Sequence, residues 1–255
     1  MSTRARTFLL ISVLICISTS FSFAFPPFRT EDAGTTPKGG IGIELGNEFT
    51  RRDDGKQDFI GLNLIYGIAN WIEIDINFAL LYLLPDSGED ETGFADILIL
   101  SKIKILGEGG ILGQRDYFPD LVLEPSVLIP TGNEDKGLGS GELELGLLLA
   151  LEKKLWRFTG RANIGYFATN IPVVDENFED RFFYGFEVDL PLSERLLLGQ
   201  ELTGGFGSGD RNTLFTLTGL VFTVTENVAF NLGLEFGLKG VQSAVTGLAG
   251  VTLSY

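Results

Sequence analysis

The sequence predicts an all-β protein, a transmembrane antiparallel up-and-down β-barrel of about twelve strands of the bacterial outer-membrane type. Three observations lead to this prediction. The first residues form an apolar leader, short segments of alternating polarity fill the rest of the chain, and tight turns alternate with long polar loops. Together they predict strands with hydrocarbon on one face and water on the other.

The first 24 residues have the features of a secretory signal peptide. Arg4 and Arg6 precede the apolar run 8–17, and the small residues Ser22 and Ala24 suit a cleavage site after position 24. The alternative is an uncleaved membrane anchor, but the run is short for a spanning helix of about 20 residues. Cleavage would leave 231 of the 255 residues and remove the one cysteine, so we expect no disulfides in the mature chain.

The composition narrows the class further. The formal net charge is −15, and it becomes −17 once the two arginines of the leader are removed. Such an acidic chain repels nucleic acid, so we expect no nucleic-acid partner. No later stretch is long and apolar enough for a membrane helix. A mature chain that enters a membrane must therefore do so as a closed barrel, which satisfies its own backbone hydrogen bonds.

The segment 71–82 shows the alternation most clearly. Successive side chains of a strand point to opposite faces. One face would be apolar and the other polar, with Ile72, Ile74, Ile76, Phe78 and Leu80 opposite Glu73, Asp75, Asn77 and Ala79. We predict twelve such segments: 39–49, 59–68, 71–82, 94–106, 121–130, 142–152, 156–167, 181–192, 196–204, 213–224, 228–238 and 244–255. Three of them, 121–130, 196–204 and 213–224, fit either phase.

The connections alternate in length, as in outer-membrane barrels. Tight turns are predicted at 69–70, 153–155, 193–195 and 225–227, and long loops at 51–58, 83–93, 131–141, 168–180 and 205–212. The connection 107–120 is an exception, because it is long and lies on the short-turn side. An even number of strands returns both ends of the barrel domain, 39–255, to the periplasmic side.

Alternation alone does not distinguish a membrane barrel from a soluble β-sandwich or lipocalin-like barrel. The clear apolar faces carry no charge, and aromatic residues cluster where strands end, as interfacial girdles do. These are Tyr66, Trp71, Trp156 and Tyr255 at one end, and Phe49, Tyr82, Tyr166, Phe182 and Tyr184 at the other. The alternating end 251–255 resembles the signal by which the barrel-assembly machinery receives its clients. We therefore expect a monomer in the outer membrane, surrounded by lipid and lipopolysaccharide.

Charged residues on the polar faces are the candidate lining of the lumen and of a path for small solutes. They are Glu44, Glu48, Glu73, Asp75, Asp96, Lys102, Lys104, Glu142, Glu144, Arg157, Arg161, Glu187, Asp189, Glu201 and Glu235. Twelve strands enclose a narrow lumen, and opposed charges across it could select solutes. The alternative is that these residues pair internally and plug a structural or adhesive barrel. The N-terminal periplasmic segment, 25–38, could occupy the periplasmic mouth or lie outside it.

An enzyme is the rival class. The chain has no histidine, so it lacks the usual general base and the commonest zinc ligand. Carboxylates such as Glu73 and Asp75 could act as acid and base, but such pairs are ordinary lumen residues. The acidic stretches 86–91 and 175–180 match no calcium-loop pattern, and the glycine-rich stretches 137–141 and 204–209 lack the setting of phosphate loops. We predict no catalytic residues, no metal site and no cofactor.

Two motifs carry a resemblance to a known family. One precedes the first segment, and the other spans the connection after residue 129. Their residues are Pro27, Phe28, Thr30, Asp32, Ala33 and Gly34, then Pro130, Thr131, Gly132, Gly139 and Gly141. Both resemble the transporter-type outer-membrane proteins of the MetA-pathway of phenol degradation family, although Pro27 and Glu31 replace the arginine and aspartate that members often have. The resemblance implies an outer-membrane barrel that passes small, aromatic or hydrophobic compounds, and it supplies no catalytic residues.

Overall fold

The computed structural model describes residues 27–53, 55–169, 179–207, 212–241 and 244–255. The predicted signal peptide, 1–24, lies outside these residues. The strands are β1 (Ile41–Arg52), β2 (Gly55–Ala69), β3 (Ile72–Pro85), β4 (Glu91–Phe94), β5 (Ile97–Leu106), β6 (Asp120–Ile129), β7 (Glu144–Leu155), β8 (Phe158–Thr169), β9 (Glu179–Pro191), β10 (Leu196–Gly207), β11 (Thr213–Thr225), β12 (Val228–Lys239) and β13 (Val245–Ser254). A 3₁₀ helix, η1, covers Glu134–Lys136. In these ranges no helix is long and apolar enough to cross a membrane.

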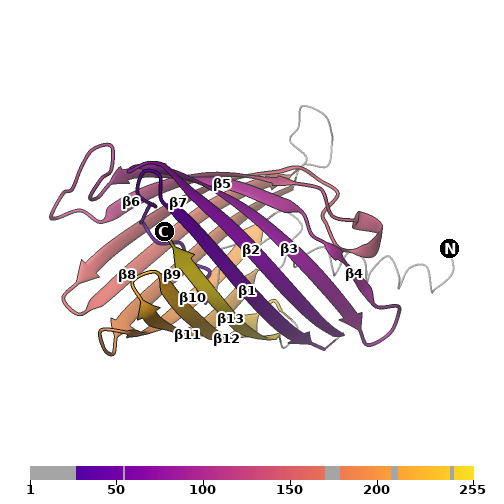
Figure 1. Cartoon of the computed structure of the whole chain (residues 1–255). Helices are drawn as coiled ribbons and strands as arrows, with labels where there is room; N and C mark the ends of the chain where they lie inside the picture. Colours follow the sequence, from indigo (N-terminus) through magenta and orange to yellow (C-terminus); the bar gives the residue numbers. More distant parts are fainter. Residues whose placement is uncertain (1–26, 54, 170–178, 208–211, 242–243) are drawn as a thin grey trace.

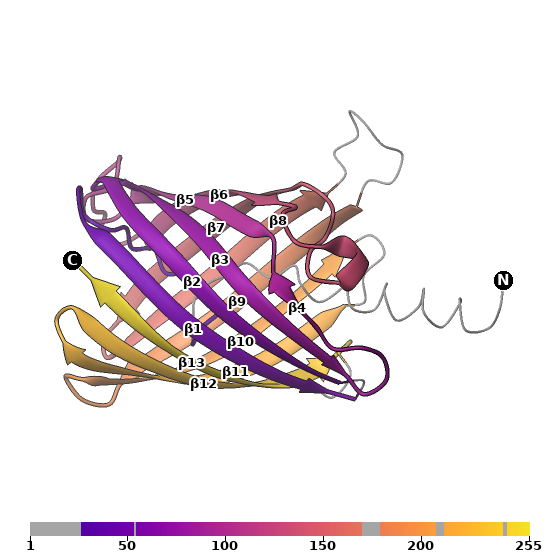
Figure 2. The ribbon, with the colours of Figure 1, turned by 45° about the vertical axis from the view of Figure 1, so that its right-hand side comes forward.

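Twelve of the strands close into a barrel (Figures 1 and 2). Strand β1 pairs with β2 on one side and β13 on the other, β2 also pairs with β3, and all pairings are antiparallel. The short strand β4 pairs with Leu80–Leu83 of β3, while β5 pairs with Ile72–Asn77 of the same strand. Strands β4 and β5 therefore share one place in the wall, interrupted at residues 95–96. The predicted fold class is confirmed.

The two faces of the wall differ as a membrane barrel requires. Outward side chains are apolar and exposed, for example Leu147 at 48%, Ile164 at 61% and Leu232 at 58%, whereas Glu73 on the inner face is 4% exposed. A soluble barrel would bury its apolar row instead. The polar face is therefore the inner one, and hydrocarbon is the matching environment for the outer one.

Aromatic side chains lie at both rims of the outer face. Trp156 and Tyr255 are 82% and 72% exposed at the short-turn end. At the loop end, the Phe182 ring packs against Tyr166 and Phe206, with centroids 4.9 Å and 5.2 Å apart. The sequence predicts this arrangement.

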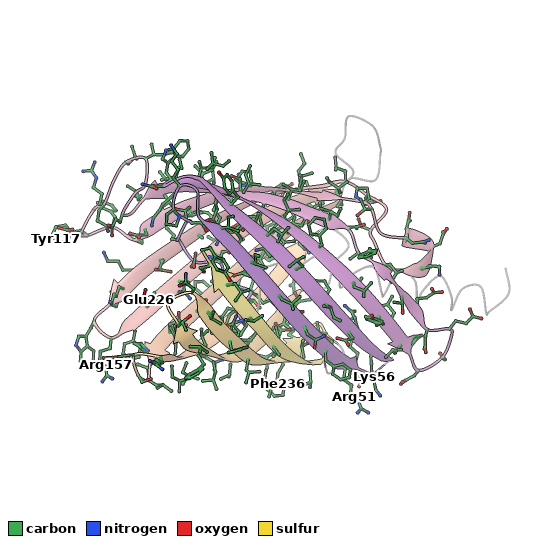
Figure 3. All side chains as sticks on the ribbon, in the orientation of Figure 1. Arg51, Lys56, Tyr117, Arg157, Glu226 and Phe236 are labelled. Carbon is green, nitrogen blue, oxygen red and sulfur yellow. The ribbon has the colours of Figure 1, made fainter. Side chains whose placement is uncertain are left out.

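The predicted loop 51–58 is wrong. Strand β1 continues to Arg52, β2 begins at Gly55, and the pairs Thr50–Gln57 and Arg51–Lys56 extend the ladder. Backbone pairing does not need apolar side chains, so the hairpin continues beyond the apolar band. Figure 3 shows Arg51 and Lys56 at this end, with Arg157 and Glu226 at the other. The predicted loop 168–180 lies mostly outside the described residues.

The segment before β1, residues 27–40, runs from the inside of the barrel to its short-turn rim, where Pro37, Lys38 and Gly39 are exposed. Near the short-turn end, the Gly39 amide donates to the Gly67 carbonyl at 2.7 Å and the Ile41 amide to the Tyr255 carbonyl at 2.8 Å. Deeper in the lumen, Phe28 and Ala33 are buried, with 8% and 2% exposure. The sequence left open whether this segment occupies the periplasmic mouth of the barrel or lies outside it. In the structure its buried part occupies the interior of the barrel. We call residues 27–40 the lumen segment.

Candidate functional site

The inner wall is divided into two halves of different polarity. The half toward the short turns carries charged side chains, among them Glu73, Lys102, Arg161 and Asp189, all on the inner face. The half toward the long loops carries buried apolar side chains: Phe59, Leu81, Leu83, Leu98, Leu100, Leu128, Leu148, Phe167, Phe183 and Phe215. The sequence predicts only the charged half, because an alternating pattern assigns every apolar residue to the outer face.

Arg29 of the lumen segment is bound to carboxylates from three strands. Its guanidinium donates to both oxygens of Glu48 at 2.6 Å and 2.8 Å, and its Nε to Glu235 at 3.3 Å. Its backbone amide donates to both oxygens of Glu201 at 3.0 Å and 2.9 Å. The Thr30 hydroxyl also donates to Glu201. Strands β1, β10 and β12 thus hold this end of the segment.

Lys102 on β5 binds the next part of the lumen segment. Its Nζ lies 2.6 Å from the Glu31 carboxylate and 3.3 Å from that of Asp32. The Asn163 side chain forms a reciprocal pair with the Glu31 backbone, accepting from its amide at 2.6 Å and donating to its carbonyl at 3.0 Å. The Thr36 amide then donates to Glu73. The segment is therefore anchored from Arg29 to Thr36.

Arg161 on β8 forms a third cluster. Its guanidinium contacts Glu152, Glu187 and Asp189, each at 2.7 Å. Arg29, Lys102 and Arg161 therefore each lie among several carboxylates. Since the described lumen holds more carboxylates than cations, its charge is predominantly negative.

Glycines on the inner wall make room for the lumen segment. A Cβ on Gly199 would lie 2.1 Å from the Phe28 ring, and one on Gly219 would lie 2.6 Å from it. Since real Cβ atoms essentially never come so close, the ring needs both glycines. The space that Phe28 needs explains why Gly199 and Gly219 stand on the inner face.

Asp96, between β4 and β5, organises the connection 130–141. Its carboxylate accepts from the Gly132 amide at 2.8 Å, and from the amide and hydroxyl of Ser140 at 2.7 Å and 2.8 Å. A Cβ on Gly139 would lie 2.4 Å from an Asp96 oxygen. The second family motif is thus a carboxylate-binding loop.

This loop closes over the apolar half of the lumen. Leu138 is 2% exposed and packs with Phe59, Leu81, Leu83 and Ala95. Outside it, the Lys136 ammonium donates to Glu91 at 2.8 Å, and this hydrogen bond raises the pKa of Lys136.

Asp96→Ala is expected to release this loop without unfolding the barrel. The substitution removes three hydrogen bonds to a charged acceptor, each contributing about 1.5–3 kcal/mol, while the barrel ladders stay intact. Limited proteolysis of the refolded protein should give cleavage within 131–141 that is absent from the wild type. Glu89→Ala, in an exposed stretch of the neighbouring loop, is the control. Equal resistance of Asp96→Ala and wild type would contradict the proposed anchoring.

At the loop end, Arg181 connects the two kinds of lining. Its guanidinium lies 3.3 Å from Glu144 and over the Phe167 ring, with the carbon 4.9 Å from the centroid. A cation above an aromatic face is attracted to it, so a charged pair is held beside the apolar wall.

The structure places most predicted lining residues on the inner face or at its edge. On the inner face are Glu44, Glu48, Glu73, Asp75, Lys102, Lys104, Glu144, Arg161, Glu187, Asp189, Glu201 and Glu235. Asp96 is buried beside the connection 130–141, and Glu142 is half-buried within that connection. Lys104 pairs with Asp120 at 3.7 Å.

Arg157, predicted to line the lumen, lies outside it. It is exposed in the short turn after β7, and its guanidinium carbon lies 5.8 Å from the Trp156 ring centroid. Figure 3 shows it at the end of the barrel, away from the lumen. The alternation of polar and apolar residues does not predict the facing of Arg157, because the chain has left the strand at this point. Trp156 has a positive φ of 56°.

Sequence reasoning missed several inner residues. Glu124, 2% exposed, lies in β6, where both phases fit. Glu152 lies near the end of β7, and Arg29 and Glu31 lie outside any strand. Only the family motif around Asp32 indicated that this region matters.

Solved structures similar to this chain are outer-membrane barrels. An outer membrane channel from Pseudomonas putida F1 has a TM-score of 0.68 at 14% identity, covering 90% of this chain and all of that one. The NanC porin has a TM-score of 0.61 at 8% identity over 83% and 98% of the two chains. The KdgM porin in complex with disordered oligogalacturonate has a TM-score of 0.58 at 10% identity, over 84% and 99%. At these identities the likeness shows the fold alone.

The search of the curated proteins finds no match. A family model matches residues 27–255, which include both motifs, the lumen segment and every strand of the barrel. The chain therefore belongs to the family described as "Putative MetA-pathway of phenol degradation".

Proposed function

We propose that the protein is an outer-membrane channel for the passive passage of small, largely apolar solutes, aromatic compounds among them. The observation that carries this proposal is the apolar inner wall of the loop half, where Phe59, Leu81, Leu83 and Phe167 are buried inside the barrel. A sugar or ion gains little from such a wall, whereas an apolar solute gains free energy from each Å² that it removes from water.

The similar structures and the family description support the same proposal. The Pseudomonas putida F1 protein is described as a channel and the other two as porins, and the family description refers to phenol degradation. We place this chain in the outer membrane as a monomer, in contact with lipid and lipopolysaccharide. Tyr255, 72% exposed at the end of the chain, would be read by the barrel-assembly machinery.

Two features count against an enzyme. The chain has no histidine, and the carboxylates Glu187, Asp189 and Glu201 are bound by Arg161 or by the lumen segment. Carboxylates held in this way are poorly placed to exchange protons with a substrate.

A non-conducting structural barrel is the second candidate. The lumen segment favours it, because its contacts from Arg29 to Thr36 lie across the charged half. The two candidates differ in whether a solute that enters the loop half can continue past that segment.

The channel proposal predicts that serine at Leu81 and Leu83 weakens binding of an apolar solute. Leu138 packs against Leu81 and Leu83 in the structure. A solute that takes its place and covers about 60 Å² of this wall gains about 1.5 kcal/mol, roughly tenfold in affinity. The measurement is block of single-channel current by benzyl alcohol in planar bilayers. Leu84→Ser, on the outer face of the same strand, should leave block unchanged. Absence of conductance at all voltages, with the lumen segment present or deleted, would favour the structural barrel.

A further inference from the structure

One long connection runs along the short-turn end of the barrel. Residues 107–119 join β5 to β6, whereas the other connections at this end are short: 70–71, 156–157, 192–195 and 226–227. In the first half of the long connection, the Ile111 amide donates to the Lys104 carbonyl at 3.0 Å. A Cβ on Gly109 would lie 3.2 Å from the Asn70 carbonyl oxygen. This half therefore packs against the end of β5 and the neighbouring β2–β3 turn.

Lys153 holds the second half of the connection on the outer side of the wall. Lys153 is on the same face of β7 as Leu147 and Leu149, because side chains two residues apart point to the same side of a strand. Both leucines are exposed on the outer face. The Lys153 ammonium donates to the carbonyls of Asp116 and Phe118 at 2.6 Å and 3.0 Å. This half of the connection therefore lies beside the lipid-facing surface, and not over the mouth of the lumen.

The connection and the adjacent β7–β8 turn expose large apolar side chains. Ile111, Leu112 and Phe118 are 53%, 58% and 60% exposed. Tyr117 is 96% exposed, and Trp156 in the β7–β8 turn is 82% exposed. Single exposed apolar side chains are ordinary, but a group of them marks contact with a partner or a membrane.

Positive charge accompanies these apolar side chains. Arg115 and Arg157 are exposed, and within the ranges that the structure describes neither guanidinium forms an ion pair with a carboxylate. Cations outnumber carboxylates in residues 107–119 and 153–157, although the whole chain has a formal net charge of −15: Arg115, Lys153, Lys154 and Arg157 against Glu108 and Asp116. Figure 3 shows Tyr117 and Arg157 at the same end of the barrel. We call the following residues the rim patch: Arg115, Tyr117, Phe118, Trp156 and Arg157.

We propose that the rim patch binds the headgroup of an anionic phospholipid such as phosphatidylglycerol. The short turns of outer-membrane barrels face the periplasm, so the patch would meet the periplasmic leaflet. Arg115 and Arg157 would bind the phosphate, since guanidinium groups form strong hydrogen bonds with phosphate oxygens. The three aromatic rings would lie at the level of the headgroups, where amphipathic rings are favoured.

A lipid fits this patch better than an acidic protein, because the patch is continuous with the outward row of β7 that ends at Lys153. Its cations lie where the phosphates of a surrounding leaflet would be. The proposal requires that the barrel lies in a membrane, and it holds whether or not solutes pass through the lumen.

Tryptophan fluorescence tests the proposal, because Trp71 and Trp156 are the two tryptophans of the chain. Trp71→Phe leaves Trp156, within the patch, as the reporter. The refolded protein is placed in vesicles of phosphatidylcholine and phosphatidylglycerol in which one or the other lipid carries bromine, which quenches a tryptophan that it contacts. The ratio of the two quenching curves gives the relative affinity of the two lipids near Trp156. We expect phosphatidylglycerol to be preferred by roughly fivefold or more.

Arg115→Gln/Arg157→Gln in the same background should reduce this preference by roughly fivefold or more. The matched control, Arg51→Gln/Lys56→Gln, removes two exposed cations at the loop end (Figure 3) and should leave the preference unchanged. If Trp71→Phe does not refold, the same comparison is made with both tryptophans present, since Trp71 lies at the same end of the barrel.

Equal quenching by the two brominated lipids before any arginine is replaced would overturn the proposal, and would leave the patch to an acidic partner protein. An equal loss of preference in the loop-end control would also overturn it, because the effect would then belong to the overall charge of the protein. Loss confined to the rim-patch variant supports the proposal. None of these readouts depends on conductance, so failure of the proposed channel function and failure of lipid binding are distinguishable.

Discussion

Replacing Arg29 by alanine is expected to open the barrel to ions. Arg29 is the residue of the lumen segment with the most charged contacts, two to Glu48 and one to Glu235. Breaking a buried ion pair by removing one partner costs about 3–5 kcal/mol, because the other charges stay buried and unpaired. At about 1.4 kcal/mol per tenfold, the equilibrium between docked and released segment would shift at least roughly 100-fold toward release.

Single-channel recording would show this as longer and more frequent high-conductance states in Arg29→Ala than in wild type. The barrel should remain folded, because every strand pairing stays in place. Arg157→Ala, at an exposed position in a short turn, is the control for the loss of a positive charge. Deletion of residues 25–36 should reproduce the high conductance permanently. Identical closed levels in wild type, Arg29→Ala and the deletion would mean that the segment does not limit the current.

The pattern of alternating residues was sufficient to predict the barrel, because hydrocarbon imposes one rule on every outward position. Ile74 and Leu147 must be apolar, and their neighbours Glu73 and Gly146 need not be. The rule is weaker where a strand leaves the apolar band. This is why the ladder at Arg51–Lys56 looked like a loop and why Arg157 was assigned to the lumen.

The contents of the lumen could not be predicted in the same way. Its contacts join residues that are far apart in the sequence, such as Glu31 with Asn163 and Arg29 with Glu235. No local period relates such residues. The buried apolar side chains of the loop half also escape a period-two reading, because Leu81 follows Leu80 and precedes the outward Tyr82. A continuous apolar run of this kind indicates a strand that is apolar on both faces.

Replacing Lys102 by methionine is expected to destabilise the barrel far more than the same replacement of Lys104 on the same strand. Met retains most of the side-chain volume, so the change isolates the charge. Lys102 is 8% exposed, and its ammonium lies 2.6 Å from the Glu31 carboxylate and also attracts that of Glu124. Its removal would leave these carboxylates buried without a cation, at a cost of about 3–5 kcal/mol.

The free energy of unfolding in lipid vesicles, measured by urea titration, is the readout. Lys104→Met is the matched control on the same strand and face, since its partner Asp120 is 28% exposed at the side chain and 3.7 Å away. We expect it to cost about 1 kcal/mol or less. Adding Glu31→Gln to Lys102→Met should restore part of the lost stability, because it removes one of the repelling charges. The coupling energy of this double-mutant cycle should be about 0.5–3 kcal/mol. An effect of Lys102→Met no larger than that of Lys104→Met would mean that the carboxylates around it are already neutral.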